Sequence, residues 1–87
     1  MALVHVPPVE ARVRWDRGAD RPAEISWPGH HLRVTDLDAV RDERAAYPAE
    51  RGPRVTLVLR TDDGGRAAVV FDGRRRLWFL DAVEPAA

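Results

Sequence analysis

The last third of the chain carries a clear β-hairpin pattern. Two apolar runs, residues 55–59 and 67–71, flank an Asp-Asp-Gly-Gly segment at residues 62–65. A three-residue loop over 62–64 suits a type I turn followed by a left-handed glycine, and it pairs Thr61 with Gly65. This register gathers the odd-numbered apolar residues on one face: Val55, Leu57, Leu59, Ala67, Val69 and Phe71. Because a one-residue slip would exchange the two faces, burial favours this register over a two-residue loop.

The first third of the chain shows the same period of two. Between residues 9 and 16, apolar residues alternate with charged ones, which is typical of a half-buried strand. A turn at residues 17–20 leads to a second strand that ends at residue 27. Pro28-Gly29 then favours a type II turn into a third strand, because proline sets φ at the first central position and glycine accepts a positive φ at the second.

Two of the three tryptophans are expected in the core. Trp15 falls on the same face of its strand as Val13, and Trp27 falls on the same face as Ile25. These neighbours are aliphatic, and a buried aromatic ring contributes a large apolar area to a small core. We therefore predict that Trp15 and Trp27 pack inside the domain.

The final strand, from about residue 76 to residue 83, is apolar on both faces. One side carries Leu77, Phe79 and Val83. The other side carries Trp78, Leu80 and Ala82. If the first set faces inward, the second set forms an exposed apolar surface suited to a protein partner or a second copy of the chain. Alternatively, residues 41–53 or the N-terminal segment cover that surface.

Six short strands joined by close turns predict an all-β fold. A chain of 87 residues can fill one hydrophobic core, so we expect an N-terminal segment, residues 1–8, followed by one β domain, residues 9–87. The strands are expected to form an antiparallel meander, closed as an SH3-like barrel or folded as a two-layer sandwich. Residues 41–53 are predicted to be a long loop, and a helix capped by Asp38 that ends at Tyr47 is the alternative.

Composition excludes several classes of protein. The chain has no cysteine, which removes disulfides, thiolate metal sites and cysteine nucleophiles and makes a cytoplasmic location the expectation. Its start lacks the basic and apolar stretches of a signal peptide or membrane span, so no membrane contact is expected. Fourteen arginines balance fourteen acidic residues, so the net charge is zero. Nucleic-acid binding would therefore need a local basic patch.

The residues that could carry catalysis or bind a metal form no convincing site. The lone serine, Ser26, is predicted to lie within a strand rather than at the exposed turn that a serine nucleophile needs. His30 and His31 are neighbours on a strand and point to opposite faces, so both cannot easily bind one ion. Asp62 and Asp63 lack the further oxygen ligands of a calcium loop. We therefore expect no enzyme activity, metal or cofactor, and infer no small-molecule substrate.

Two groups of arginines are candidates for a basic patch. The polar face of the first strand carries Arg12 and Arg14. The last strand is preceded by Arg74, Arg75 and Arg76. Guanidinium groups bind phosphate in a bidentate manner, and with an exposed tryptophan nearby they would form a platform for single-stranded nucleic acid.

The order of motifs along residues 9–83 resembles a known domain family. Arg21-Pro22 leads to Trp27-x-Gly29, which is followed by Leu32-x-Val34, a glycine-rich hairpin and Trp78-x-Leu80. This order resembles a small bacterial domain family of unknown function, found alone or at the C-terminus of the Y-family-polymerase-like accessory subunit used in damage-induced mutagenesis. His30-His31 departs from the family's arginine and aromatic residue, and the segment after Val40 lacks its tryptophans. The resemblance implies an accessory or recruitment role in DNA repair, without an activity or a binding residue to carry over.

The sequence therefore favours a non-enzymatic interaction module. We predict a cytoplasmic bacterial protein that forms a homodimer or docks a protein partner through its last strand, at Trp78, Leu80 and Ala82. The alternative function is weak binding of single-stranded nucleic acid. The residues predicted for that function are Arg12, Arg14, Arg74, Arg75 and Arg76.

Overall fold

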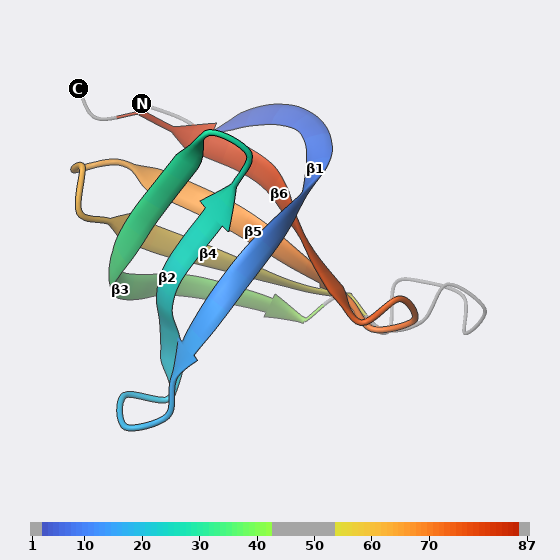
Figure 1. Ribbon diagram of the computed structural model, residues 1–87, viewed down its shortest axis with the longest axis horizontal. Helices are drawn as coiled ribbons and strands as arrows, with labels where there is room; N and C mark the ends of the chain where they lie inside the picture. Colours follow the sequence, from blue (N-terminus) through green and yellow to red (C-terminus); the bar gives the residue numbers. More distant parts are fainter. Residues whose placement is uncertain (1–2, 43–53, 86–87) are drawn as a thin grey trace.

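The protein is an all-β barrel, as the alternating sequence predicts. A computed structural model describes residues 3–42 and 54–85, and in these ranges the chain forms six strands (Figure 1). The strands are β1 Val4–Asp16, β2 Arg21–Trp27, β3 His30–Asp42, β4 Arg54–Thr61, β5 Arg66–Asp72 and β6 Leu77–Glu84. Each strand pairs antiparallel with the next, and β6 pairs with β1 to close the barrel. The barrel alternative is thus confirmed over the sandwich.

The third strand is longer than predicted. Residues 38–42 belong to β3, so the alternative of a helix beginning at Asp38 is wrong for these residues. Val40 and Arg41 pair with Leu57 and Thr56 of β4, and this ladder satisfies backbone groups that a helix would otherwise pair internally. The rest of the predicted loop, residues 43–53, lies outside the described residues.

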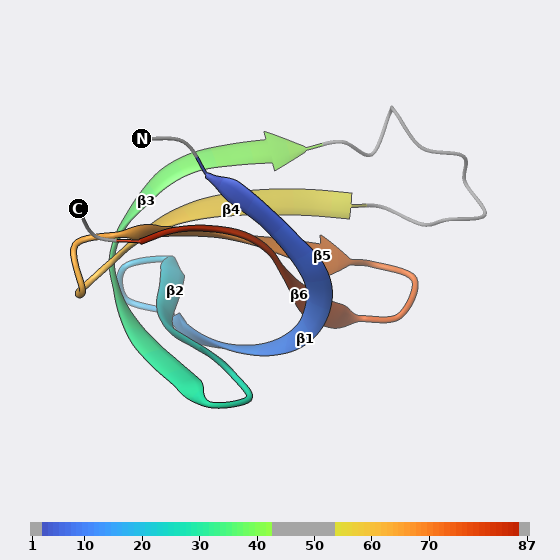
Figure 2. The same ribbon diagram turned by 90° about the horizontal axis from the view of Figure 1, so that it is seen from above.

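Two long strands divide the barrel into a small and a large sheet. The first part of β1 pairs with β6 and its last part pairs with β2, while β3 pairs first with β2 and then with β4. Shifts of register bend both strands, at Arg14/Trp15 in β1 and at Val34/Asp36 in β3. A three-stranded sheet therefore faces a five-stranded sheet that contains β4, β5 and β6 (Figure 2).

The core between the two sheets confirms the hairpin register. Leu59 pairs with Ala67 and Leu57 pairs with Val69, and all four side chains are buried in one cluster. Gly64 has a φ of 86°, the left-handed conformation that the three-residue loop demands. Its N–H donates to the carbonyl oxygen of Thr61 at 3.1 Å.

The direction of the last strand differs from the predicted exposed face. Leu80 is only 3% exposed and belongs to the core, and Trp78 packs against that core. Leu80 lies opposite Val69, a core residue of β5, so Leu80 and Trp78 point inward and Phe79 points outward. At a bulge, the pairing with β5 then steps to Ala82 opposite Ala68 and skips Asp81, so Ala82 also points outward.

Trp15 is not buried in the core. It lies opposite Pro22 near the end of β1, beside the turn to β2, and it is 43% exposed. The prediction that Trp15 is buried is therefore wrong. Trp27 packs against the core as expected, and its ring stacks on His30 with a centroid distance of 4.8 Å and an interplanar angle of 22°.

Candidate functional site

The outward face of the large sheet carries a strip of apolar side chains. We call this set the outer strip: Val58, Ala68, Val70, Phe79 and Ala82. Strand pairing brings these residues together, because Ala68 lies opposite both Val58 and Ala82, and Val70 lies opposite Phe79. Val70 is 4% exposed and Ala82 is 1% exposed, although they point away from the barrel interior. Of the described residues, Leu3 packs against the Val58, Ala68 and Ala82 part of the strip.

Two hollows lie over the outer strip. The larger, with a volume of about 350 Å³, lies over Val58, Ala68 and Ala82 and is bordered by Arg41 and Arg66. The smaller, with a volume of about 170 Å³, is lined by Val70 and Phe79 and bordered by Arg54 and Arg75. Both hollows include Asp81 at the bulge of β6. The apolar floor is thus flanked by guanidinium groups along its length.

The bulge residue Asp81 also pairs with a histidine at the rim of the strip. The Nδ1 atom of His5 lies 3.4 Å from an Oδ2 oxygen of Asp81, so the two groups form an ion pair when His5 is protonated. The side chain of His5 is 81% exposed and that of Asp81 is 33% exposed. The contact is therefore open to water and adds little stability by itself.

One end of the hairpin formed by β4 and β5 is held by ion pairs. Arg66 donates to Oδ2 of Asp38 at 3.1 Å and to Oε2 of Glu84 at 2.5 Å, and Arg60 donates to Oδ1 of Asp38 at 3.1 Å. We call these four residues the Arg66 network. The hydrogen bonds from Arg60 and Arg66 lower the pKa of Asp38, and the hydrogen bond from Arg66 lowers that of Glu84. The network links β3, β4, β5 and β6, and each of its two guanidinium groups forms an ion pair with a carboxylate.

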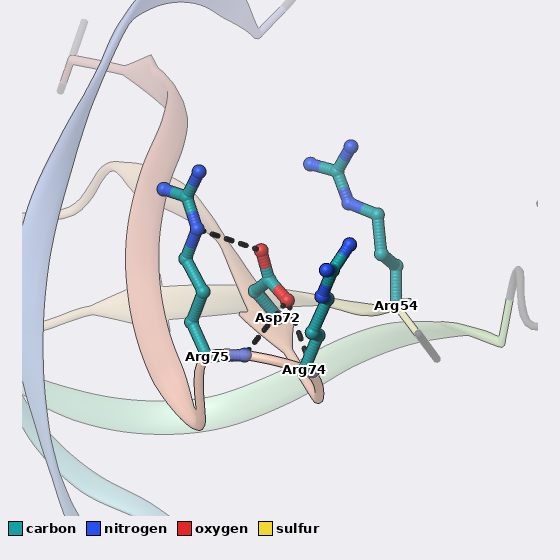
Figure 3. Close-up of a pocket in the computed structure, with 4 residues that line it drawn as sticks. All are labelled: Arg54, Asp72, Arg74 and Arg75. Carbon is teal, nitrogen blue, oxygen red and sulfur yellow. Dashed lines mark hydrogen bonds and ion pairs between the residues drawn. The ribbon is translucent and has the colours of Figure 1, made fainter. Parts of the chain in front are cut away.

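The other end of the same hairpin forms a pocket of about 560 Å³. We call it the arginine pocket, lined by Arg54, Asp72, Arg74 and Arg75. Arg54 is the first residue of β4 and lies opposite Asp72, the last residue of β5. The turn that follows adds Arg74 and Arg75, and Figure 3 shows all three guanidinium groups extending to the same side of the turn. Three guanidinium groups and one carboxylate thus line one pocket.

Asp72 fixes the conformation of this turn. Its Oδ1 oxygen accepts hydrogen bonds from the backbone N–H groups of Arg74 at 3.1 Å and Arg75 at 3.2 Å. The Nε atom of Arg75 lies 3.9 Å from Oδ2 of Asp72. The N–H of Arg76 donates to the carbonyl oxygen of Asp72 at 2.7 Å, and Arg76 itself has a φ of 56°. Three backbone N–H groups therefore donate hydrogen bonds to Asp72 and hold the turn on which the pocket is built.

The five arginines predicted to bind nucleic acid are not gathered on one surface. Arg74 and Arg75 line the arginine pocket, whereas Arg76 does not line it. Arg12 lines a separate hollow beside Trp27 on β2. Arg14 makes a two-point contact with Glu24, at 3.2 Å from Nε to Oε2 and 3.1 Å from Nη2 to Oε1.

Glu24 is shared by two partners on the small sheet. Besides Arg14, it is contacted by Nε2 of His31 at 3.2 Å. The hydrogen bonds from Arg14 and His31 lower the pKa of Glu24 to about 2. The guanidinium group of Arg14 is thus matched by a carboxylate that stays ionised over the ordinary pH range.

Sequence reasoning missed Arg54, although the pattern contained it. The predicted hairpin register places Val55 opposite Phe71, and one further step along both strands places Arg54 opposite Asp72. The same register puts the even-numbered residues on the outward face. Along β4, that face carries Arg54, Thr56, Val58 and Arg60, so an arginine stands at each end of the strand.

The three histidines are separated and have different neighbours. His5 contacts Asp81, His30 stacks on Trp27 and His31 contacts Glu24. Within residues 3–42 and 54–85, no three side chains of histidine, aspartate or glutamate come together as a metal site would require. Ser26 lies within β2, as predicted, and is half-buried.

Comparisons with known proteins gave no relative. No protein-family model, no characterised protein and no solved structure matches the chain. In the part of the chain that the structure describes, no helix has the length and apolar character needed to span a membrane.

Proposed function

We propose that this chain is a non-enzymatic interaction module that docks an acidic, partly apolar segment of a partner protein beside Phe79 on its outer strip. The other four side chains of the strip are at most 5% exposed, so the observation that carries the proposal is the hollow at Phe79, which is half-buried and bordered by Arg54 and Arg75. Apolar side chains at the centre of such a surface give affinity, and charged groups at its rim select the partner.

Within the strip, Phe79 is the side chain that a partner can reach. Ala68 and Ala82 are 4% and 1% exposed and form the covered floor beside it. Phe79 is half-buried and supplies the aromatic anchor that interfaces favour. The segment would place an apolar residue against Phe79 and acidic residues beside the flanking arginines.

The last strand remains part of the proposed interface, but the residue that would contact the partner differs from those predicted from the sequence. Trp78 and Leu80 face the core, so they support the barrel beneath the surface. The outward residues of β6 are Phe79 and Ala82. Ala82, the third residue predicted from the sequence, points outward but is 1% exposed, so it lies beneath the proposed interface.

Charge favours a different protein over a second copy of this chain. A two-fold symmetric dimer would place the same surface against itself. Arg54 and Arg75 would then face the arginines of the other copy, and like charges brought together in an interface oppose association. An acidic partner has no such penalty.

Single-stranded nucleic acid is the second candidate, because the arginine pocket also suits phosphate. A platform for single strands combines arginines with several stacking rings. The outer strip offers Phe79, whereas Trp78 packs against the core and Trp15 lies on β1 beside the turn to β2. The balance therefore supports the protein partner. The setting in DNA repair and the cytoplasmic location remain predictions from the sequence.

Two synthetic peptides test the proposed function. The first alternates valine and glutamate, and the second replaces every glutamate with lysine. We expect the acidic peptide to shift amide resonances of residues 56–58, 68–70 and 79–82, with an affinity that falls as salt is added. Phe79→Ser should weaken binding about tenfold, and Trp15→Ser is the matched control at an exposed ring on the small sheet. Equal binding of the lysine peptide, or shifts confined to β2, would contradict the proposal.

A further inference from the structure

We infer that the protein forms a two-fold symmetric dimer, in which a second copy of this chain covers a hollow over β1 and the end of β2. The hollow has a volume of about 430 Å³ and is lined by Glu10, Arg12, Ser26, Trp27 and Pro28. It shares no lining residue with the hollow at Phe79, although Glu10 lies opposite Phe79 in the ladder of β1 and β6. Dimerisation at this hollow does not depend on the docking function proposed above.

The two charged residues of this hollow lie on the outward face of β1. Ala11 between them is 5% exposed and belongs to the core, so Glu10 and Arg12 both point away from the core. Both residues are exposed. Residues two apart on a strand lie about 7 Å from each other on the same face. The surface therefore presents one negative and one positive charge side by side.

Neither charge has a partner in the part of the chain that the structure describes. Across residues 3–42 and 54–85, no hydrogen bond or ion pair joins the side chain of Glu10 or Arg12 to another residue. Arg14, two residues further along β1, differs in this respect, because Glu24 contacts two of its nitrogens at 3.2 and 3.1 Å. The charges of Glu10 and Arg12 are thus available to a partner that carries the opposite charges in the matching order.

A second copy of this chain carries those charges in that order. A two-fold axis that crosses the strand at Ala11 sets the two β1 strands antiparallel and face to face, with Glu10 of each copy against Arg12 of the other. One contact surface then makes two equivalent ion pairs. On the outer strip the same symmetry would bring like charges together, whereas here it brings opposite charges together. Charge complementarity therefore selects a second copy at this surface.

The hollow also supplies apolar area near the centre of such an interface. Trp27 follows Ser26, which lies opposite Arg12, and it is half-buried where it lines the hollow beside Pro28. Its ring stacks on His30 with a centroid distance of 4.8 Å, which limits its motion. An ordered aromatic ring near the two-fold axis, with a charged pair on either side, is the arrangement that protein interfaces favour.

Charge reversal tests the dimer without any peptide. Sedimentation velocity over a concentration series should show the wild type in equilibrium between monomer and dimer, and added salt should weaken the dimer. Glu10→Arg and Arg12→Glu each create two like-charge contacts per dimer, so each should weaken association by about a hundredfold. Arg17→Glu is the matched control, because it reverses an exposed charge in the turn after β1. A wild type that stays monomeric, or charge-reversed variants that associate as it does, would overturn the dimer.

Mixing the two charge-reversed variants keeps the test decisive where either is less stable. In the mixture one chain presents two arginines and the other presents two glutamates, so the two chains should associate with each other although neither associates with itself. The double variant Glu10→Arg/Arg12→Glu restores both pairs and should dimerise as the wild type does. If the mixture or the double variant remains monomeric, the two-fold contact is overturned.

Discussion

The two ends of the β4–β5 hairpin use the same residue types for opposite purposes. At the loop end, Arg60 and Arg66 are held by Asp38 and Glu84 from neighbouring strands, so the charges join four strands together. At the other end, Arg74 and Arg75 follow Asp72 in a turn, and the Asp72 carboxylate accepts hydrogen bonds from both of their backbone N–H groups. The difference shows that the count of arginines says little about function. What matters is which groups the fold places opposite each of them.

The largest expected effect comes from the core that supports both ends. Leu59 is fully buried in the strand that joins the Arg66 network to the arginine pocket. Leu59→Ala should lower the free energy of unfolding by about 3 kcal/mol, since it removes packed methyl groups and leaves a cavity. Urea denaturation measures the change. Val40→Ala, at a side chain that is 55% exposed, is the control and should change stability by about 0.5 kcal/mol or less.

The next effect separates the two ends directly. Arg66→Gln leaves Asp38 and Glu84 without their shared guanidinium group, so the urea midpoint should fall clearly. Arg75→Gln removes a side chain that is 68% exposed and whose Nε atom lies 3.9 Å from Asp72, so it should leave the midpoint close to that of the wild type. Equal loss of stability in both variants would remove the distinction between the two ends.

Acid should weaken the network end through its carboxylates. Asp38 and Glu84 have a pKa below the ordinary values of 3.8 and 4.5 in the folded protein, so the unfolded chain takes up protons first as the pH falls. Their stabilisation is present above those ordinary values and is lost progressively below them. Urea midpoints measured between about pH 6 and about pH 3 should fall less steeply in Glu84→Gln than in the wild type. An unchanged slope would contradict the assignment.

The smallest effects concern the two turns. The loop end uses Gly64 at a φ of 86°, and the pocket end uses Arg76 at a φ of 56°. Gly64→Ala forces a side chain into the left-handed region and should cost about 1 kcal/mol. Arg76→Gly should relieve the same strain and stabilise the protein by about 0.5 kcal/mol. A thermal or urea melt checks both signs.

The parts of the fold that follow from local rules could be predicted from the sequence. Turn chemistry at Gly64 and burial of the odd-numbered residues sufficed to fix the hairpin register. Alternation also gave the strand at residues 9–16, although Val4 was not expected to begin it. Closure into a barrel was one of two alternatives, because it depends on the pairing of β1 with β6, which no local signal records.

The candidate site was harder to predict because bulges carry little sequence signature. One extra residue, Asp81, places Ala82 on the outward face while Leu80 faces the core. Trp15 is exposed near the end of β1, although its place in the alternation matches that of Val13. Charge pairing across strands was also invisible locally, since Arg14 meets Glu24 only when β1 lies beside β2. Arg54 was accessible from the hairpin register, but it lies at the start of β4, next to the segment predicted to be a loop.

The most direct test of the account is to locate the valine-glutamate peptide on the protein by intermolecular nuclear Overhauser effects. We predict contacts from the peptide's valine methyl groups to the ring of Phe79. Contacts to Trp15 and Trp27 on the small sheet instead, or a peptide that binds equally well after Phe79→Ser, would contradict the proposed docking surface.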